Sequence, residues 1–456
     1  MISASSNDAN EFRVLVVDPF ARAVYMREDR NEYRLIRVSV PTGSRPAQQL
    51  QKELREVWGL MVLVLDVMIP KDGDRPCAIV ELLRRDAAEG IASIEPDQIP
   101  DDELSTQERT WLLSVLSGDP IHPIARIGWA DDAVRWVETT TKSKVLSKTD
   151  IEQFNAGNGF SLLCFRMNDG ATHWLKATGA PNTQERSVSL LLTRLCRDYV
   201  PEVVAERLEW NAWLMHSSGQ SLSKLPQEAP EVKRTLQVAV KSLAGLQIRT
   251  VGAELDLLNA GAVDHRTHVL RNDAEALFTY IDEAMGYQTS TKVSPVRPKR
   301  LGELKNIFED ACDYLSELDI PDTILHGDLN VDNILFAGTH CVFIDWSEAY
   351  VGNPLVTYEH LLLLNQIEDP SLKASCNRHL RTTYLKAMSS ICDFRVLEDA
   401  LPFAPIIAAA STILGRKDWL QTRERSDPRK FPLVRAIARH LDRAAQAPSL
   451  LRALLV

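Results

Sequence analysis

The stretch ILHGDLNVDNILFAGTHCVFIDW, residues 324–346, constrains this chain more than any other. Two short apolar runs, 333–336 and 341–344, flank a turn that contains Gly338, which predicts a β-hairpin. In an antiparallel hairpin the start of one strand lies beside the end of the other, so Asn333 and Asp345 become neighbours. Asp328 lies on the loop that leads into the first strand. We therefore expect three oxygen-bearing side chains to converge at one end of a small apolar platform.

These three side chains suit a divalent metal and a proton acceptor. Carboxylate and amide oxygens are the hard ligands that Mg²⁺ prefers, and Mg²⁺ usually keeps waters and substrate phosphates in its other positions. Asp328, if it does not bind the metal, is free to accept a proton. Taken singly, an Asp at a strand end and an Asn before a strand are also common turn residues. Together, at this spacing, they indicate a functional site.

Composition sets the broad class of the protein. The chain has 456 residues, of which 45% are hydrophobic and 25% charged, enough for two or three globular cores. Its formal net charge of −10 disfavours a general nucleic-acid binder. The seven cysteines contain no CxxC pair, so neither a disulfide framework nor a zinc site is indicated, and their odd number fits a reducing cytosol.

We expect a cytoplasmic protein without a membrane partner. The longest apolar runs, 60–69 and 401–414, are too short to cross a bilayer and are interrupted by Asp66 and Pro405. The first residues, MISASSNDANEF, lack an apolar signal core, and we predict a disordered tail over residues 1–11.

The first half of the chain is predicted to hold a small α/β domain and a linker. Residues 12–117 alternate strand-like runs with two helical patterns, the first of which ends at Gly59. Residues 118–149 begin with a segment rich in Pro and Gly and continue as a short helix, which favours a linker.

The second half is predicted to have two lobes. The pattern of residues 150–220 predicts antiparallel strands and one helix from about Thr183 to Arg197. A further strand follows, and it is succeeded by a segment of small residues. Residues 221–456 are mostly helical, with the hairpin as the exception. The fold class is therefore α+β, with a β-rich lobe, a helical lobe and a cleft between them.

The motif His326-Gly327-Asp328, followed by Asn333 and then by Asp345, resembles the aminoglycoside phosphotransferase (APH) and choline kinase-like family. These proteins are small-molecule relatives of the protein kinases, whose catalytic loop has a parallel pattern. The resemblance implies a bilobal protein-kinase-like fold over roughly residues 150–360 and beyond. It implies that Asp328 orients or deprotonates the acceptor hydroxyl, that Asn333 and Asp345 hold Mg²⁺, and that His326 orients the loop.

The resemblance also suggests residues that bind the nucleotide. A phosphoryl-transfer site needs a cation near the phosphates, and Lys176 ends a strand where the family's nucleotide-contacting lysine stands. An exposed lysine at a strand end is the alternative. Glu185 would pair with Lys176, although Asn182-x-x-Glu185 is equally a capping-box pattern.

Two further segments correspond to parts of the family's nucleotide site. Met215 and His216 stand in the inter-lobe linker, where main-chain groups would contact the purine. The turn Gly157-Asn158-Gly159 occupies the place of a phosphate-covering loop, but a simple hairpin turn is the better interpretation. Asn330 could contact a phosphate or cap the loop.

The helix predicted near residue 50 faintly resembles a degenerate Nudix signature. Glu53 and Glu56 match loosely, whereas Val57 replaces a metal-binding glutamate of that family. A solvated helix face is the better interpretation of these two glutamates, and an unrelated α/β module is an equal alternative to a catalytically dead Nudix domain.

The acceptor pocket carries no motif. Residues 416–443 hold nine Lys or Arg against four Asp or Glu. If this segment lines the site it does not suit a polycationic aminoglycoside, and the alternative is a solvated basic face. The identity of the acceptor is therefore left open between an uncharged or anionic hydroxylated metabolite, a sugar and an antibiotic.

The sequence favours an ATP- or GTP-dependent small-molecule O-phosphotransferase that requires Mg²⁺ and transfers the γ-phosphoryl group to an acceptor hydroxyl. Its partners would be the nucleotide and a small hydroxylated acceptor. The alternative is a kinase-like regulatory protein that binds nucleotide without turnover. A protein kinase is less favoured because H-R-D and A-P-E patterns are absent from the sequence.

Overall fold

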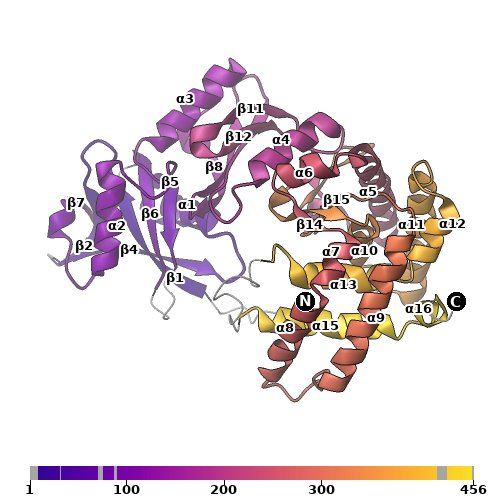
Figure 1. The fold of residues 1–456 in the computed structure, drawn as a ribbon. Coiled ribbons are helices and arrows are strands. Elements are labelled where there is room, and N and C mark those ends of the chain that lie inside the picture. Colours follow the sequence, from indigo (N-terminus) through magenta and orange to yellow (C-terminus); the bar gives the residue numbers. More distant parts are fainter. Residues whose placement is uncertain (1–8, 31, 70–74, 87–89, 418–428, 454–456) are drawn as a thin grey trace. The chain divides into compact units, whose positions relative to one another are not determined.

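The computed structural model describes residues 9–30, 32–69, 75–86, 90–417 and 429–453 (Figure 1). The backbone divides into two compact units. Unit 1 comprises Met1–Arg186 with Glu202–Ser217, and unit 2 comprises Ser187–Pro201 with Ser218–Val456. The predicted small α/β domain and the predicted β-rich lobe thus lie together in unit 1.

Unit 1 contains two sheets and three long helices. Its strands are β1 (Ala9–Val17), β2 (Val24–Asp29), β3 (Glu32–Arg34), β4 (Ile36–Pro41), β5 (Leu60–Met68), β6 (Cys77–Arg85), β7 (Ile91–Ile94), β8 (Glu152–Gly157), β9 (Phe160–Arg166), β10 (Thr172–Ala177), β11 (Val203–Arg207) and β12 (Ala212–His216). Its helices are α1 (Pro46–Trp58), α2 (Thr106–Ser117) and α3 (Trp129–Thr141), and α4 (Glu185–Leu195) begins here and continues in unit 2.

The N-terminal sheet of seven strands is covered on both faces. Its order is β3-β2-β1-β6-β5, with β4 on β1 and β7 on β2, and β1 runs parallel to β6. Val14 and Val16 pack with α1, whereas the intervening Leu15 and Val17 pack with α2, because successive side chains of a strand point to opposite faces. Ala9–Glu11, predicted as part of a tail, instead begin β1 and pair with β4, and residues 1–8 lie outside the described part.

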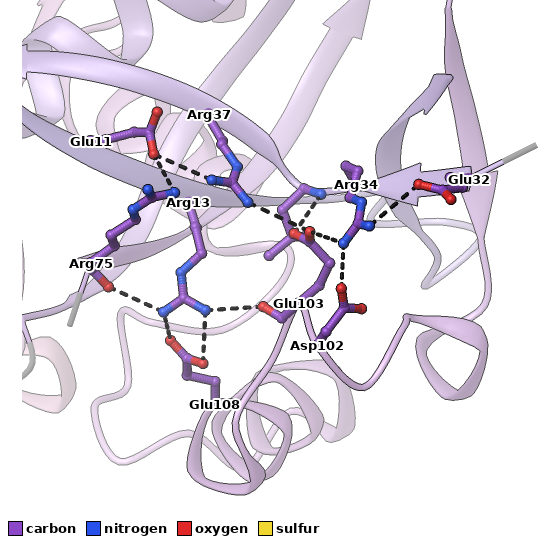
Figure 2. Close-up of polar contacts among 10 residues, drawn as sticks. Glu11, Arg13, Glu32, Arg34, Arg37, Arg75, Asp102, Glu103 and Glu108 are labelled. Carbon is purple, nitrogen blue, oxygen red and sulfur yellow. Dashed lines mark hydrogen bonds and ion pairs between the residues drawn. The ribbon is translucent and has the colours of Figure 1, made fainter. Parts of the chain in front are cut away.

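A network of arginines and carboxylates fastens α2 and the loop before it to this sheet (Figure 2). Glu103 is buried, and its carboxylate accepts hydrogen bonds from Leu35 N at 3.0 Å and from Arg34 at 3.1 Å. Arg13 donates to the carboxylate of Glu108 and, at 3.0 Å, to the carbonyl oxygen of Glu103. Glu108 also closes a capping box with Ser105, which fixes the first turn of α2.

The second sheet of unit 1 has the order β11-β12-β10-β9-β8. Helix α3 packs on it through Trp129, Ala130, Ala133 and Val137, which share a buried cluster with strand residues such as Leu175. The short helix predicted within residues 118–149 is α3, and its apolar face packs on this sheet.

Unit 2 is mostly helical and holds two small sheets. Its helices are α5 (Ala229–Thr250), α6 (Glu254–Asn259), α7 (Thr267–Asn272), α8 (Ala274–Gly286), α9 (Pro298–Glu317), α10 (Leu355–Leu363), α11 (Pro370–Met388), α12 (Phe394–Ala400), α13 (Ala404–Leu414), α15 (Phe431–Ala445) and α16 (Pro448–Ala453). Its strands are β13 (Gln220–Ser221), β14 (Val263–His265), β15 (Thr323–His326), β16 (Ile334–Phe336), β17 (Cys341–Phe343) and β18 (Ala349–Gly352).

The predicted hairpin is β16–β17, in the register Ile334 to Phe343, and β13 adds a third strand to it. The hairpin is not the sole β-structure of this unit, since β14, β18 and β15 form a second sheet. That sheet was missed because its strands have only three or four residues. The fold class is α+β, as predicted.

Within the described residues, no single helix is long and apolar enough to cross a membrane. Helices α12 and α13 meet the length and composition criteria only as a pair, with a bend of 64° between them.

Candidate active site

The loop that carries Asp328 is anchored by His326. The His326 side chain is buried, its Nε2 donates to the carbonyl oxygen of Ile344 at 2.8 Å, and its ring lies 4.7 Å from that of Trp346. Burial lowers the pKa of His326, so the ring is neutral near pH 7. The bond to Ile344 joins the start of the loop to the residue before Asp345, an arrangement that suits an orienting role.

Gly327 allows the chain to pass a buried ring. A Cβ at this position would lie 2.4 Å from Cε2 of Tyr350, so only glycine fits. Its N–H donates to the carbonyl oxygen of Glu348 at 2.7 Å. The next residue, Asp328, is exposed and lies at the mouth of a cavity.

Asparagine side chains fix the turn after Asp328. The Asn333 amide donates to the carbonyl oxygen of Asp328 at 2.8 Å and, more weakly, to its carboxylate at 3.3 Å. Asn330 accepts from the N–H groups of Asp332 and Asn333 at 2.9 and 3.2 Å. The contacts of Asn330 are thus those of a residue that caps the loop.

The hairpin brings Asn333 and Asp345 together, as predicted from its register. The N–H of Ile344 donates to the carbonyl oxygen of Asn333 at 3.0 Å, which places Asp345 one residue beyond this pair. Asp345 has φ of +67°, a conformation that few non-glycine residues adopt and that is common at functional sites. Because the Asn333 amide nitrogen donates to Asp328, the amide oxygen is left for another partner.

The donor set fits Mg²⁺ held jointly by protein and substrate. It offers one amide oxygen and one carboxylate, both hard ligands, and Mg²⁺ bound by one or two protein side chains takes its other ligands from phosphates and water. Among the described residues no group of three or more His, Cys, Asp or Glu side chains is arranged to hold a metal. A site at Asn333 and Asp345 therefore depends on oxygens that a phosphate would bring.

Lys176 and Glu185 form a buried ion pair in unit 1. Lys176 Nζ lies 2.5 Å from Glu185 Oε1, and both side chains are buried. The rings of Phe160 and Trp213 lie 5.5 and 5.9 Å from Lys176 Nζ. Helix α4 begins at Glu185, so this residue is not at the third position that a capping box from Asn182 would need.

Met215 and His216 are at the end of β12, the strand between β10 and β11. The N–H of His216 already donates to the carbonyl oxygen of Glu202 at 3.0 Å. A purine contact through that N–H would require this bond to break, and the contacts of Met215 and His216 with a purine stay a prediction. Glu53 and Glu56 lie on α1 with Glu56 exposed.

A cavity of about 360 Å³ opens beside Asp328 in unit 2. Sequence reasoning missed the polar residues that line it, which are Glu359, His360, Thr412 and His440. They lie on α10, α13 and α15, whose sequence patterns are those of ordinary core helices. No local signal could have grouped them.

A family comparison matches the part of the chain that holds these motifs. Residues 171–374 match the family model described as Phosphotransferase enzyme family, APH. The APH segment includes Lys176, Glu185, Asp328, Asn333 and Asp345. The match supports phosphotransferase activity, and it begins beyond α1, so the Nudix resemblance receives no support.

Three solved structures resemble this chain weakly. One is a choline/ethanolamine kinase family protein from Mesorhizobium loti, at 14% identity, covering 70% of this chain and 98% of that one with a TM-score of 0.42. A macrolide 2'-phosphotransferase from Brachybacterium faecium has 14% identity, coverage of 67% and 96% and a TM-score of 0.41. Plasmodium vivax ethanolamine kinase has 11% identity, coverage of 78% and 93% and a TM-score of 0.44. These likenesses are weak, and no curated protein sequence matches the chain.

Proposed function

We propose that this protein is a small-molecule O-phosphotransferase that moves the γ-phosphoryl group of ATP or GTP to a hydroxyl group of its acceptor. The observation that carries the proposal is the position of Asp328, exposed at the mouth of a cavity and held by the same loop as Asn333. A carboxylate so placed can accept the proton of a hydroxyl in the cavity.

The proposed reaction uses each group of the site once. Asp328 accepts the hydroxyl proton, the acceptor oxygen bonds to the γ-phosphorus, and the bond from that phosphorus to the β–γ bridging oxygen breaks, releasing the nucleoside diphosphate. Asn333 and Asp345 would hold Mg²⁺, which when bound neutralises charge on the phosphates. We assign Lys176 to the nucleotide phosphates, with Glu185 holding its ammonium group.

The proposed setting is the cytoplasm, where such nucleotides are plentiful. The seven cysteines are all free and buried, which agrees with a reducing compartment. A regulatory protein that binds nucleotide without turnover is the alternative function.

The test is nucleotide consumption by the full chain with a panel of hydroxylated acceptors. Asp328→Asn should lower acceptor-dependent turnover about 10²- to 10⁴-fold while nucleotide binding is kept, since it removes only the proton acceptor. Asp332→Asn is the matched control, because Asp332 is an exposed acid of the same loop that accepts from Ser223 Oγ at 2.5 Å. Nucleotide binding with no Asp328-dependent turnover would favour the regulatory alternative.

A further inference from the structure

We infer that the acceptor is an apolar alcohol that carries one positively charged group, and that Glu359 binds this group. The inference rests on the proposed function, because it names the substrate class of the cavity beside Asp328.

Most of the cavity wall is apolar. Helix α10 supplies Leu363 and its neighbour Leu364, α13 supplies Pro405 and two alanines, and α15 supplies Ile437 and Ala436. Such a wall stabilises a ligand chiefly by removing its apolar surface from water, at about 25 cal/mol per Å². A strongly hydrated ligand would lose its water here without gaining polar partners.

The cavity holds two carboxyl groups and few other polar groups. Burial lowers the pKa of His360 and of His440, so both rings are neutral near pH 7. Thr412 donates its hydroxyl to the carbonyl oxygen of Ala408 at 2.8 Å. If Asp328 serves the reacting hydroxyl, Glu359 is left as the one acidic group of the lining that can pair with a charge on the acceptor.

The carboxyl group of Glu359 makes no hydrogen bond or ion pair with any residue that the structure describes. Arg381 acts on this carboxyl group through space but is paired with Glu398 at 3.4 Å. Burial raises the pKa of Glu359 to about 7. A carboxyl group held without a partner in an apolar wall gains most from a cation supplied by the ligand.

Among the residues that the structure describes in the C-terminal region, no Lys or Arg lines the cavity. Arg435 donates to the carbonyl oxygen of Ala284 at 2.9 Å, and Arg439 donates to that of Arg435 at 3.2 Å. The part of α15 that reaches the cavity is Ala436, Ile437 and His440. The described lining thus offers two carboxylates and no Lys or Arg, which suits one positive charge on the acceptor better than a negative charge or several positive ones.

The test compares three alcohols on the full chain by calorimetric binding and by turnover. They are a cyclohexanol bearing a dimethylamino group, its neutral twin bearing an isopropyl group, and a tricationic aminocyclitol. We expect the dimethylamino compound to bind at least tenfold more tightly than either of the others. Glu359→Gln should remove its advantage over the neutral twin.

Glu398→Gln is the matched control, because it removes an equal charge from an exposed acid that also faces Arg381. It should leave all three affinities unchanged. The inference would be overturned if the isopropyl compound or the aminocyclitol bound most tightly. It would also be overturned if Glu359→Gln weakened the binding of the dimethylamino and isopropyl compounds equally. Binding without turnover would instead count against the proposed function alone.

A separate set of contacts, all within unit 1, carries a second inference. We infer that Asp66 is a positioning residue that fixes the turn Gly157-Asn158-Gly159 for the nucleotide phosphates. This inference also rests on the proposed function.

Asp66 connects three elements of unit 1. Its Oδ1 accepts from the N–H of Val67 at 2.9 Å and from the N–H of Asn158 at 2.8 Å, while Oδ2 accepts from Trp111 Nε1 at 3.1 Å. Asp66 is itself buried and stands at a register shift in β5. The turn is thus tied to a residue 92 positions earlier in the chain.

The turn is enclosed by other residues as well. A Cβ at Gly159 would lie 2.7 Å from Nδ1 of His122, and one at Gly179 would lie 2.4 Å from the carbonyl oxygen of Asn158. The same strand, β5, receives Gln153 of β8, whose side chain accepts from Val64 N at 2.7 Å. The N–H groups of this turn are therefore ordered before any ligand arrives, which lowers the entropy cost of binding.

The test is binding of a fluorescent ATP analogue to the full chain. Asp66→Ala should weaken it at least fivefold with acceptor affinity unchanged. Trp111→Phe is the control, since it removes one hydrogen bond of Asp66 and leaves the bond to Asn158, so it should bind nucleotide as the wild type does. Equal nucleotide affinity in Asp66→Ala and the wild type would overturn the inference.

A second measurement decides the point if Asp66→Ala does not fold. Hydrogen exchange of the wild-type turn should show protection of the Asn158 amide in the absence of nucleotide. Fast exchange at that amide would also overturn the inference.

Discussion

The ion pair of Lys176 and Glu185 has a structural role, and the proposed function gives it a second role at the nucleotide phosphates. Both side chains are buried, so each charge has lost most of its hydration and depends on the other. The pair also keeps an ammonium group at the end of β10, where the proposed function requires a cation for the phosphates. The two roles respond differently to substitution and can be separated.

We expect Lys176→Met to lower the free energy of unfolding by about 3 kcal/mol, because it leaves the Glu185 carboxylate buried without its partner. The double variant Lys176→Met/Glu185→Leu should recover most of this loss, since an apolar pair of similar volume needs no hydration. Nucleotide binding should be lost in both. Chemical denaturation and nucleotide titration measure the two effects, and a double variant that binds nucleotide normally would contradict the assigned role of Lys176.

At the scale of the element, the segment from β15 to β17 is held by short-range contacts. His326 bonds to Ile344, Gly327 passes the Tyr350 ring, and Asn333 closes the turn on Asp328. The Tyr350 ring is buried and lies 4.1 Å from the His265 ring, so it cannot move aside. The geometry of the loop that carries Asp328 therefore depends on the absence of a side chain at Gly327.

Gly327→Ala should reduce turnover more than tenfold and destabilise the fold by about 1–3 kcal/mol, because the new Cβ overlaps the Tyr350 ring. Steady-state kinetics and thermal unfolding would measure these effects. Gly302→Ala is the control: this glycine lies within α9 with no atom near its Cβ position. It should stabilise the protein by about 0.5–1 kcal/mol with unchanged turnover. Normal activity in Gly327→Ala would show that the loop can relax.

At the scale of the whole molecule, each unit buries titratable groups that make its stability depend on pH. In unit 1, Glu81 is buried, and burial raises its pKa to about 7 although Gly128 N donates to its carboxylate at 2.9 Å. In unit 2, burial lowers the pKa of His265 to about 3, and the ring bonds Ser411 and Gly415. These two groups act in opposite directions of pH: Glu81 makes the fold less stable as pH rises through about 7, and His265 makes it less stable as pH falls below the ordinary pKa of histidine.

The folded state of unit 1 binds a proton at Glu81 more tightly than the unfolded state does, so stability falls as pH rises from about 4.5 through 7. The loss amounts to roughly 3 kcal/mol, on the order of 1.4 kcal/mol for each pKa unit. Glu81→Gln keeps an oxygen for Gly128 and should raise the unfolding temperature by several degrees at pH 8 and little at pH 5. Glu56→Gln, at an exposed site on α1, should give the same small effect at both pH values. Calorimetry across this range measures the difference.

The sequence alone determined the features that depend on near neighbours in the chain. The hairpin register followed from two apolar runs and a turn, and the convergence of Asn333 with Asp345 followed from that register. Helix α1 ends at Gly59 in the left-handed conformation, as its sequence predicts, because glycine adopts positive φ at little cost. Such contacts are set by the backbone periodicity of a single element.

Only the tertiary structure decided which distant groups meet. The cavity draws Glu359 and His440 from helices whose sequences signal nothing but a buried face, and Asp66 meets Asn158 across 92 residues. The short helix α3 was predicted from its own pattern, but that pattern cannot show which sheet the helix covers. The physical reason is that the packing of apolar faces is not directional. The pattern of one element therefore indicates which of its faces is buried, but not which other element packs against that face.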